Sequence, residues 1–313
     1  MTNSFLKKIT RTLRYSGVNG LNRKSGDRSG LHVMSPPESF PLIATDPLIE
    51  NIRHQNKNSV PGYCAVCEKK TDFLFSPALV QAIRHQEYIN WREDLPCCRC
   101  GFSARMRATV DILRHYGTAP VFMAGDSYIT EAVTPLYSWL KQHLLPQLEG
   151  SEFLGSDKIP GQLYPFQSGL LRHEDVTRLS FADASVRLLL SFDVLEHVSD
   201  FRQALHEFYR VIAPGGACLL TVPLDIDRRH SERRAQINAA GDIEYLQPPH
   251  YHGDPLNGKG VLCFHDYGLD FIDFIRQAGF STIDCIMAQS IEKMYLGHAM
   301  LFLWIQKQPA ASV

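Results

Sequence analysis

Five of the eight cysteines in this chain fall close together and have the spacing of metal ligands. Cys64 and Cys67 are separated by two residues, and after 29 residues come Cys97, Cys98 and Cys100. A two-residue spacing lets both thiolates of a pair face one ion, and two such pairs complete a tetrahedral zinc site. We therefore predict a structural zinc ion held by Cys64, Cys67, Cys97 and Cys100, and leave open whether Cys98 replaces Cys97. The alternatives are a redox pair or simply buried thiols.

The charges between the two cysteine pairs are mixed. Lys69, Lys70, Arg84 and Arg92 alternate with five acidic residues, so no basic face for phosphate binding is expected. We therefore predict a structural or docking module rather than a nucleic-acid-binding one. The remaining cysteines lie in apolar or strand-like segments and are expected to pack in the core; they are Cys218, Cys263 and Cys285.

A second group of residues follows the predicted strands. In an open α/β sheet, ligands bind outside the carboxyl ends of the strands. An acid after the second strand can accept both hydroxyls of a ribose, and an acid after the third can receive the amino group of an adenine. The candidate cofactor contacts are Gly125, Asp126 and Glu131 near the first strand, Asp157 after the second, and Asp175 and Asp193 further along.

Histidines are crowded into a segment rich in Tyr and Pro that follows a predicted strand ending near Pro223. His250, His252 and His265 are candidate general bases, with Asp266 as the residue that orients one of them. The alternative for each histidine is a surface or structural role. A nearby cluster of arginines suits either an anionic acceptor or a solvated face; its members are Arg228, Arg229, Arg233 and Arg234.

Short apolar strands alternate with amphipathic helices from residue 120 onward, which predicts an α/β fold with a parallel sheet. The predicted strands are Val121–Ala124, Glu152–Gly155, Val186–Phe192, Ala217–Val222, Phe280–Ala288 and Ala299–Gln306, and the predicted helices are Glu131–Leu148, Phe201–Ile212 and Leu269–Ala278. The last two strands are close in sequence and are expected to pair antiparallel. We predict a Rossmann-like, mostly parallel sheet with a C-terminal antiparallel hairpin, preceded by a small four-cysteine zinc ribbon.

Composition and charge divide the 313 residues into three parts. Residues 1–58 form a basic arm and linker, with seven Lys and Arg against one acid in the first thirty; residues 59–116 form the zinc-ribbon-like module and a connecting helix; residues 117–313 form the larger domain. The arm is either a solvated tail or a weak membrane-surface contact. No apolar run is long enough to span a membrane and no signal peptide opens the chain, so we expect a cytoplasmic protein.

Three motifs in the larger domain resemble those of a known enzyme family. They are Leu-Ser-Phe-Ala-Asp-Ala-Ser at 179–185, Ser-Phe-Asp-Val-Leu-Glu-His-Val at 191–198 and Arg-Val-Ile-Ala-Pro-Gly-Gly at 210–216. Together they resemble the class I S-adenosylmethionine-dependent methyltransferases, in particular those acting on small molecules, over about residues 117–308. The resemblance implies S-adenosylmethionine as cofactor, methyl transfer to a small-molecule or glycan acceptor, and Asp157 and Asp175 as the ribose and adenine acids.

One segment departs from the family pattern. The loop after the first strand normally reads acid-x-Gly-x-Gly-x-Gly, whereas residues 123–131 retain a single glycine. Either Gly125 and Glu131 substitute in cofactor binding, or the domain has lost the cofactor and is a non-catalytic binding or scaffold protein. A further alternative is an RNA or protein methyltransferase that docks through its zinc ribbon. The Asn/Asp-Pro-Pro-Tyr/Phe signature of base or amide methylation is absent, and we make no prediction of the oligomeric state.

Overall fold

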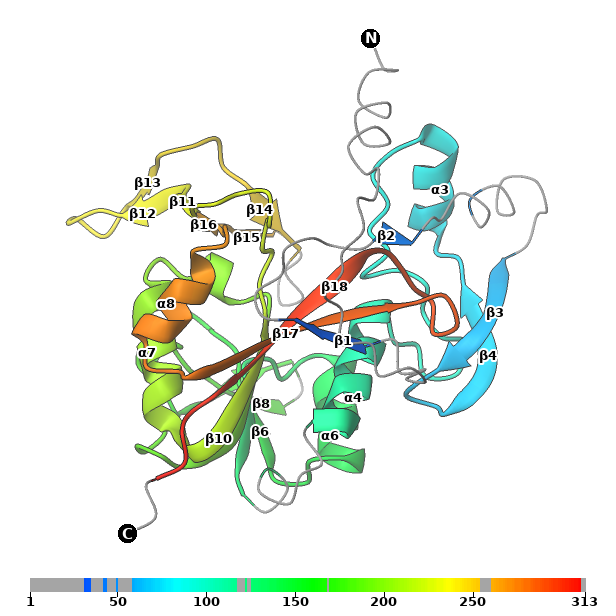
Figure 1. Ribbon diagram of the computed structural model, residues 1–313. Coiled ribbons are helices and arrows are strands. Elements are labelled where there is room, and N and C mark those ends of the chain that lie inside the picture. Colours follow the sequence, from blue (N-terminus) through cyan, green and yellow to red (C-terminus); the bar gives the residue numbers. More distant parts are fainter. Residues whose placement is uncertain are drawn as a thin grey trace. The chain divides into compact units, whose positions relative to one another are not determined.

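The computed structural model describes residues 31–34, 42–43, 49, 58–116, 122, 125–167, 169–253 and 260–310 (Figure 1). The basic arm predicted for the first thirty residues lies outside these ranges. Residues from Leu31 to Val313 form one compact unit. Within the described ranges, no helix has the length and apolar character that a bilayer-spanning segment needs.

A mixed, mostly parallel sheet runs through the unit (Figure 1). In spatial order its strands are β1 (Leu31–Met34), β17 (Thr282–Ser290), β18 (Tyr295–Gln306), β10 (Ile212–Thr221), β9 (Val186–Phe192), β5 (Ser127–Ile129) and β6 (Leu148–Gly150), with β2 (Leu42–Ile43) paired to β18. Strands β6, β5, β9 and β10 are mutually parallel, whereas β18 is antiparallel to β10 and to β17. The predicted Rossmann-like sheet with a closing antiparallel hairpin is confirmed.

Strand β9 lies at the centre of the sheet because its side chains are apolar on both faces. Leu188 and Leu190 belong to the core that also contains α4 (Ala104–Tyr116) and α6 (Pro135–His143). Leu189 points to the opposite face of the sheet, into a second core. That core contains residues of α7 (Phe201–Val211) and α8 (Phe271–Gln277). Burial of each such leucine contributes about 1.5–3 kcal/mol, so the continuous apolar run selects the central position.

The first two strands lie elsewhere than the sequence predicted. Val121–Ala124 was expected to be a strand, but Phe122 is helical and β5 begins only at Ser127. All three residues of β5 are buried, and the hydroxyl of Tyr128 is 2.7 Å from that of Ser151. The polar types in β5 hid it from a search for apolar runs. The second strand is β6, before rather than within the predicted segment 152–155.

Gly150 in β6 is required by a close approach of two other segments. An added Cβ would lie 2.7 Å from the ring of Tyr137 and 2.9 Å from the carbonyl oxygen of Glu131. We expect Gly150→Ala to lower the free energy of unfolding by about 1–3 kcal/mol, as overpacking does. Chemical denaturation measures this, with Gly169→Ala as the control because a Cβ there meets nothing within 4 Å. Equal stability of the two variants would contradict the account.

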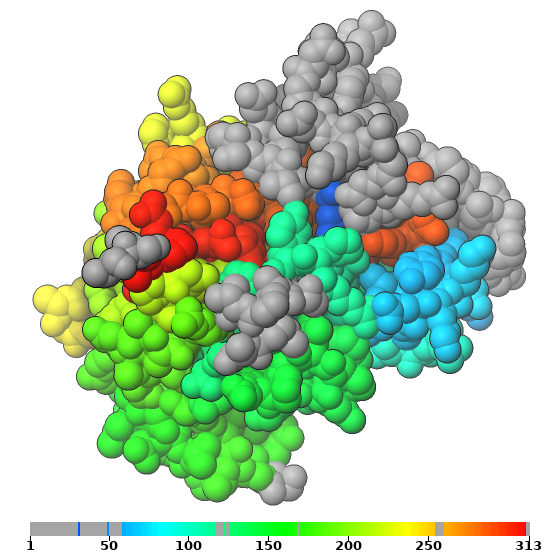
Figure 2. Space-filling model, turned by 60° about the horizontal axis from the view of Figure 1, so that its bottom comes forward, coloured from blue at the N-terminus to red at the C-terminus, as the bar shows by residue number. Residues whose placement is uncertain are grey.

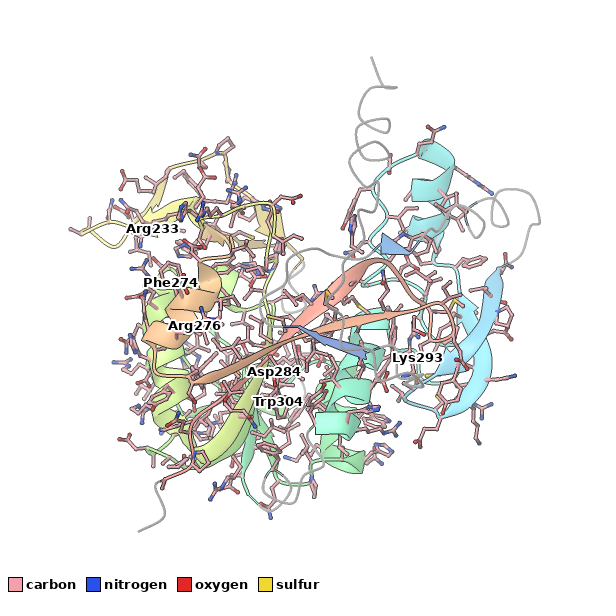
Figure 3. The ribbon with its side chains drawn as sticks, viewed as in Figure 1. Arg233, Phe274, Arg276, Asp284, Lys293 and Trp304 are labelled. Carbon is pink, nitrogen blue, oxygen red and sulfur yellow. The ribbon has the colours of Figure 1, made fainter. Side chains whose placement is uncertain are left out.

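The cysteine-rich module packs on the hairpin formed by β17 and β18 (Figure 2). It contains β3 (Ser59–Cys64), β4 (Lys69–Leu74) and α3 (Pro77–His85). The N–H of Tyr63 donates to the carbonyl of Glu292 at 2.7 Å, and Lys293 pairs with Asp111 of α4 at 2.6 Å (Figure 3). Cysteines of the module share one hydrophobic core with residues of the hairpin. The module is therefore held to the sheet by burial as well as by polar contacts.

The segment between β10 and α8 carries short antiparallel strand pairs at one end of the sheet (Figure 1). These strands are β11 (Glu232–Arg233), β12 (Ala235–Ile237), β13 (Ile243–Tyr245), β14 (Tyr251–His252), β15 (Val261–Leu262) and β16 (His265–Asp266). A separate hairpin, β7 (Leu163–Phe166) with β8 (Gly169–Arg172), follows β6. The segment after β10 holds all three histidines that were predicted as bases.

Candidate functional site

The four predicted metal-binding cysteines lie together. The sulfur atoms of Cys64, Cys67, Cys97 and Cys100 are all within 4.8 Å of one another. The Cys64 and Cys100 sulfurs are 3.8 Å apart, and those of Cys67 and Cys97 are 3.9 Å apart. Cys98 is exposed, and its sulfur lies 3.1 Å from the hydroxyl of Thr71 instead. Of the two neighbouring cysteines, Cys97 is thus the one in the cluster.

Gly125 and Asp126 precede β5, because that strand starts later than predicted. They therefore lie at its amino end, and the expectation that they follow the first strand was wrong. The carbonyl of Asp126 accepts the N–H of Arg187, at the start of β9. A Cβ on Gly125 would lie 2.2 Å from the Arg187 side chain. This packing by itself accounts for a glycine at position 125.

The loop that does follow β5 runs from Thr130 to Thr134 and contains no glycine. Glu131 in this loop accepts a hydrogen bond from the hydroxyl of Thr134 at 2.8 Å. Burial raises the pKa of Glu131, and the positive charge of Arg105 only partly offsets that effect. Of the three residues expected near the first strand, Glu131 is the one at its carboxyl end.

Glu152 is the acid that follows β6, and the sequence prediction missed it. Its Oε1 accepts the N–H groups of Ala132 at 2.7 Å and Val133 at 3.1 Å, so it holds the loop after β5 in place. The predicted ribose acid, Asp157, is further along the chain, exposed, and paired with its neighbour Lys158 at 2.6 Å. The position of Glu152 directly after Gly150-Ser151 was the available signal, but the strand had been predicted to begin there.

Asp175 lies near Glu152, because His173 forms a parallel bridge with Glu152 just before it. The Oδ1 atom of Asp175 accepts both the N–H and the hydroxyl of Thr177, at 2.9 and 2.7 Å. These bonds fix the orientation of the carboxylate. Asp175 and Glu152 are thus neighbours at the carboxyl edge of the sheet.

Asp193 follows β9 and is bound by two arginines of the cysteine-rich module. Its carboxylate is 2.6 Å from Arg92 Nη2 and 3.8 Å from Arg105 Nε, and it accepts the hydroxyl of Thr221 at 3.0 Å. Burial alone raises the pKa of Asp193, but the two guanidinium groups outweigh it and hold that pKa below its ordinary value. These arginines were not predicted as partners of Asp193, since they lie about ninety to a hundred residues from it in the chain.

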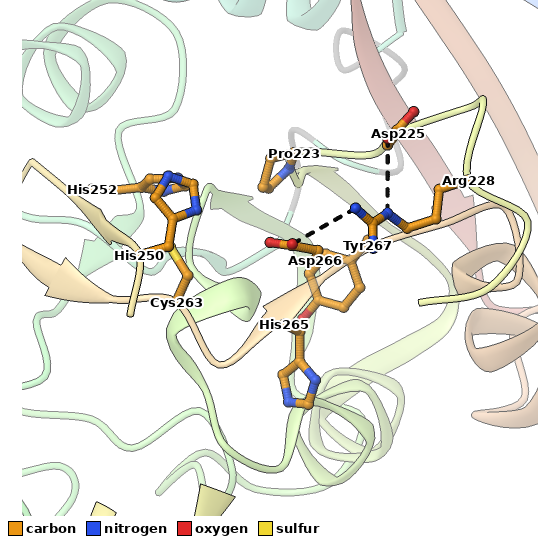
Figure 4. Close-up of a pocket in the computed structure, with 9 residues that line it drawn as sticks. All are labelled: Pro223, Asp225, Arg228, His250, His252, Cys263, His265, Asp266 and Tyr267. Carbon is orange, nitrogen blue, oxygen red and sulfur yellow. Dashed lines mark ion pairs between the residues drawn. The ribbon is translucent and has the colours of Figure 1, made fainter. Parts of the chain in front are cut away.

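A small cavity lies in the segment after β10 (Figure 4). It has a volume of about 160 Å³, which is small beside the ~300–1,000 Å³ of drug-sized ligand pockets. Its lining consists of Pro223, Asp225, Arg228, His250, His252, Cys263, His265, Asp266 and Tyr267. The fold therefore places the three predicted histidines around one cavity, although their rings are oriented differently.

His250 and His252 face each other with ring centroids 4.9 Å apart. The ring of His265 instead packs on Phe201, and one of its nitrogens lies 3.1 Å from the carbonyl of Ser199. Burial lowers the pKa of His265, which favours its neutral form. The neighbouring Cys263 thiol and Glu196 carboxylate raise the pKa of His252 to about 10, which favours its protonated form.

Asp266 does not orient a histidine. Its carboxylate is 2.7 Å from Arg234 Nη1 and 3.8 Å from Arg228 Nη2, and Arg228 is also 2.7 Å from Glu232 (Figure 4). These ion pairs neutralise the two arginines of the predicted cluster that lie nearest the cavity. Its polar wall is therefore close to neutral.

In a comparison with known proteins, residues 147–220, the segment from β6 to β10, match a family model described as a methyltransferase domain. A curated protein of Mycolicibacterium smegmatis, named "Probable S-adenosylmethionine-dependent methyltransferase", is 40% identical over 110 residues. The matched part is 33% of this chain and 41% of that relative. The chain thus spans about two fifths of the length of the curated relative it matches.

Solved structures are similar over a larger part of the chain but at low identity. An S-adenosylmethionine-dependent methyltransferase from Mesorhizobium loti is 15% identical with a TM-score of 0.40, covering 63% of this chain and 96% of that one. Phosphoethanolamine N-methyltransferase 2 of Haemonchus contortus, in complex with S-adenosyl-L-methionine, is 12% identical with a TM-score of 0.36, covering 64% and 52%. The fold assigned above rests on strand order and direction.

Proposed function

We propose that this protein transfers a methyl group from S-adenosylmethionine to a small-molecule or glycan-type acceptor. The observation that carries the proposal is the set of acids at the carboxyl edge of the sheet, Glu131, Glu152, Asp175 and Asp193. This is the edge where an open α/β sheet binds its ligands. The methyltransferase domain matched at residues 147–220 and the name of the M. smegmatis relative support the same activity.

The edge offers partners for each polar part of the cofactor. Glu152 follows β6 and suits the ribose hydroxyls, and Asp175 beside it suits the adenine amino group. Arg92 and Arg105 suit the carboxylate of the methionine moiety, while Glu131 suits its ammonium group. Arg105 Nη1 is buried without a hydrogen-bond partner among the described residues, as a donor awaiting an anionic ligand is. When bound, S-adenosylmethionine supplies an electrophilic methyl group on a sulfonium ion.

The chain's own residues then orient the acceptor and exclude water. The cavity of about 160 Å³ adjoins the end of β10, because Pro223 in its lining lies two residues beyond Thr221, which binds Asp193. A cavity of this size takes one small polar group of an acceptor, such as a hydroxyl on a ring. Positioning of this kind lowers the activation barrier by up to ~7–11 kcal/mol. Among the histidines in the lining we assign His250 as the proton acceptor, a role that accelerates a reaction by ~10²–10⁴-fold.

We also propose that Cys64, Cys67, Cys97 and Cys100 hold one zinc ion. Four thiolates are the donor set of a closed structural zinc site. Two backbone N–H groups point at the sulfurs: Cys67 N–H lies 3.5 Å from Cys64 Sγ and Arg99 N–H lies 3.4 Å from Cys97 Sγ. Such bonds stabilise thiolate charge. The ion would hold the module that carries Arg92 and Arg105 against the sheet.

One observation favours a second candidate function, a non-catalytic binding or scaffold protein. The loop after β5 has no glycine, and the N–H groups of Ala132 and Val133 are already bonded to Glu152. In that case the loop would only connect β5 to α6, and the domain would no longer bind S-adenosylmethionine. The two candidates differ in whether S-adenosylmethionine binds at all.

Calorimetric titration of the zinc-loaded chain with S-adenosylmethionine and S-adenosylhomocysteine separates them. We expect binding, and we expect Glu152→Gln to weaken it at least tenfold, or about 1.4 kcal/mol. Asp157→Asn is the matched control and is expected to bind as the wild type does, because its carboxylate is exposed.

The absence of any binding heat at high protein concentration would favour the scaffold function. Loss of binding in Asp157→Asn but not in Glu152→Gln would indicate that Asp157 binds the ribose, as predicted from the sequence. Thermal unfolding of each variant is recorded alongside, since Glu152 also holds the loop after β5.

A further inference from the structure

A second cluster of metal-ligating side chains lies apart from the four cysteines. Donor atoms of His197, His252 and Cys263 are all within 4.8 Å of one another. His197 ends η1 (Leu195–His197), the short helix after β9, whereas His252 is in β14 and Cys263 follows β15. Cys263 was predicted to pack in the core. The tertiary structure instead brings it together with two histidines, and thiolate and imidazole are ligand types that zinc prefers.

The carboxylate of Glu196 points at the same cluster. Its side chain is 0% exposed, and neither oxygen has a hydrogen-bond partner among the described residues. The nearest nitrogens are His252 Nδ1 at 3.5 Å and His197 Nε2 at 3.9 Å from Oε1. A buried carboxylate without hydrogen bonds is strongly unfavourable unless a cation compensates it. Glu196 is thus a buried carboxylate beside the donor atoms of His197 and His252.

Backbone contacts hold the ligands in the orientation that a metal needs. His197 Nδ1 lies 2.9 Å from the carbonyl of Leu262, and a proton on Nδ1 would satisfy this contact and leave Nε2 as the ligand atom. A bond from the second ring nitrogen to a carbonyl is the usual way in which proteins orient a ligating histidine. The N–H of Cys263 donates to the carbonyl of His250 at 2.8 Å, and that of Phe264 donates to the backbone carbonyl of Glu196 at 2.7 Å.

We propose that His197, His252 and Cys263 bind a second zinc ion, with the Glu196 carboxylate beside it as a counter-charge. When the metal displaces the proton of His252, the thiolate and this carboxylate carry two negative charges, which balance a divalent ion. The thiolate and imidazoles select zinc over magnesium or calcium, whose ligands are oxygens. Bonds of about 2.0–2.3 Å in a tetrahedron place donor atoms roughly 3.3–3.8 Å apart. The donor atoms of the three ligands lie within 4.8 Å of one another, and Glu196 Oε1 lies 3.5 Å from His252 Nδ1 and 3.9 Å from His197 Nε2.

This ion would connect the segment after β10 to the sheet. Glu196 and His197 follow β9, while His252 and Cys263 lie in the cavity wall. The metal would therefore fix the wall next to His250 and hold the cavity in shape. A role of this ion in acceptor binding rests on the proposed methyl transfer, whereas the zinc assignment itself does not.

Zinc content of the full-length chain, purified without chelator and measured by elemental analysis, tests the assignment. We expect about two zinc ions per chain in the wild type, given one tetrahedral site in each cluster. His252→Ala and Cys263→Ser are each expected to lose one ion, and Cys64→Ser/Cys67→Ser the other. The matched control is His250→Ala, which alters the neighbouring histidine of the same cavity and is expected to keep both ions. Cobalt loading adds a second readout, because thiolate-to-cobalt absorption is expected to decrease in Cys263→Ser.

One zinc ion per chain in the wild type would overturn the assignment. Two zinc ions in both His252→Ala and Cys263→Ser would also overturn the assignment. In that case Cys263, His252 and Glu196 would form a polar cluster without a metal. Should Cys263→Ser not fold, His252→Ala decides the question, since His252 is only half-buried at the surface strand β14. Binding of S-adenosylhomocysteine is measured separately. A chain with two zinc ions that does not bind it would refute the proposed function and leave this site standing.

Discussion

Replacement of Cys64 and Cys67 by serine is expected to remove one zinc ion and to lower the free energy of unfolding by more than about 5 kcal/mol. Structural zinc contributes about 10–16 kcal/mol in zinc-finger peptides, whereas whole domains are stable by only about 5–15 kcal/mol. The loss would not stay local, because Cys64 and Cys97 are buried in the same core as Ala288 and Leu296 of the hairpin. Elemental analysis and chemical denaturation of the same preparation measure both effects.

Cys98→Ser is the matched control for this variant. Cys98 neighbours Cys97 in sequence, but it is exposed and its sulfur contacts Thr71. We expect the control to keep its zinc and to unfold within about 0.5 kcal/mol of the wild type, as surface substitutions do. A double serine variant that keeps full zinc content and stability would show that these cysteines do not bind metal.

Arg107→Ala is expected to destabilise the protein by about 3–5 kcal/mol, the range for breaking a buried polar network. Arg107 is 0% exposed. Its guanidinium donates to the carbonyls of Lys293 at 2.6 Å, Phe102 and Leu95 at 3.2 Å, and Met294 at 3.4 Å, and it lies 4.2 Å from the ring centre of Phe73. Alanine would leave these buried carbonyls unpaired and a cavity beside the ring.

The effect is measured by urea denaturation, with Arg84→Ala as the control because Arg84 is an exposed residue of α3. We expect the control to change stability by less than about 0.5 kcal/mol. We also expect Arg107→Ala to weaken cofactor binding, since Arg105, on the same helix, is placed by that packing. Equal stability of the two arginine variants would contradict the role assigned to Arg107.

Arg107 also explains how the cysteine-rich module takes part in the site. It joins α4 and the module to the turn between β17 and β18, where Lys293 pairs with Asp111 (Figure 3). With this contact in place, Arg92 and Arg105 reach Asp193 at the carboxyl end of β9. The module thus supplies charge to the sheet edge, which is a larger role than the structural or docking one predicted for it.

Much of the fold was predictable because it depends on local patterns. The apolar run Val186–Phe192 predicted a central strand, and that range is β9. The helix predicted for Phe201–Ile212 also agrees with α7. The first strand was misplaced because Ser127 and Thr130 are polar, although both are buried in the fold. Their burial is stabilised by hydrogen bonds across the sheet, such as that of Thr130 to Ser191 at 3.2 Å, which a sequence pattern does not reveal.

The sequence by itself determined the features that short spacing controls. Two cysteine pairs predicted the cluster of four, and strand–helix alternation predicted a mostly parallel sheet with an antiparallel hairpin. The packing of the folded chain was needed to show which acid stands at the end of β6, that Arg92 and Arg105 reach Asp193, and that His197 and His252 meet Cys263. These contacts join residues tens of positions apart. Their partners are chosen by the packing of whole elements, and residue spacing carries no information about that packing.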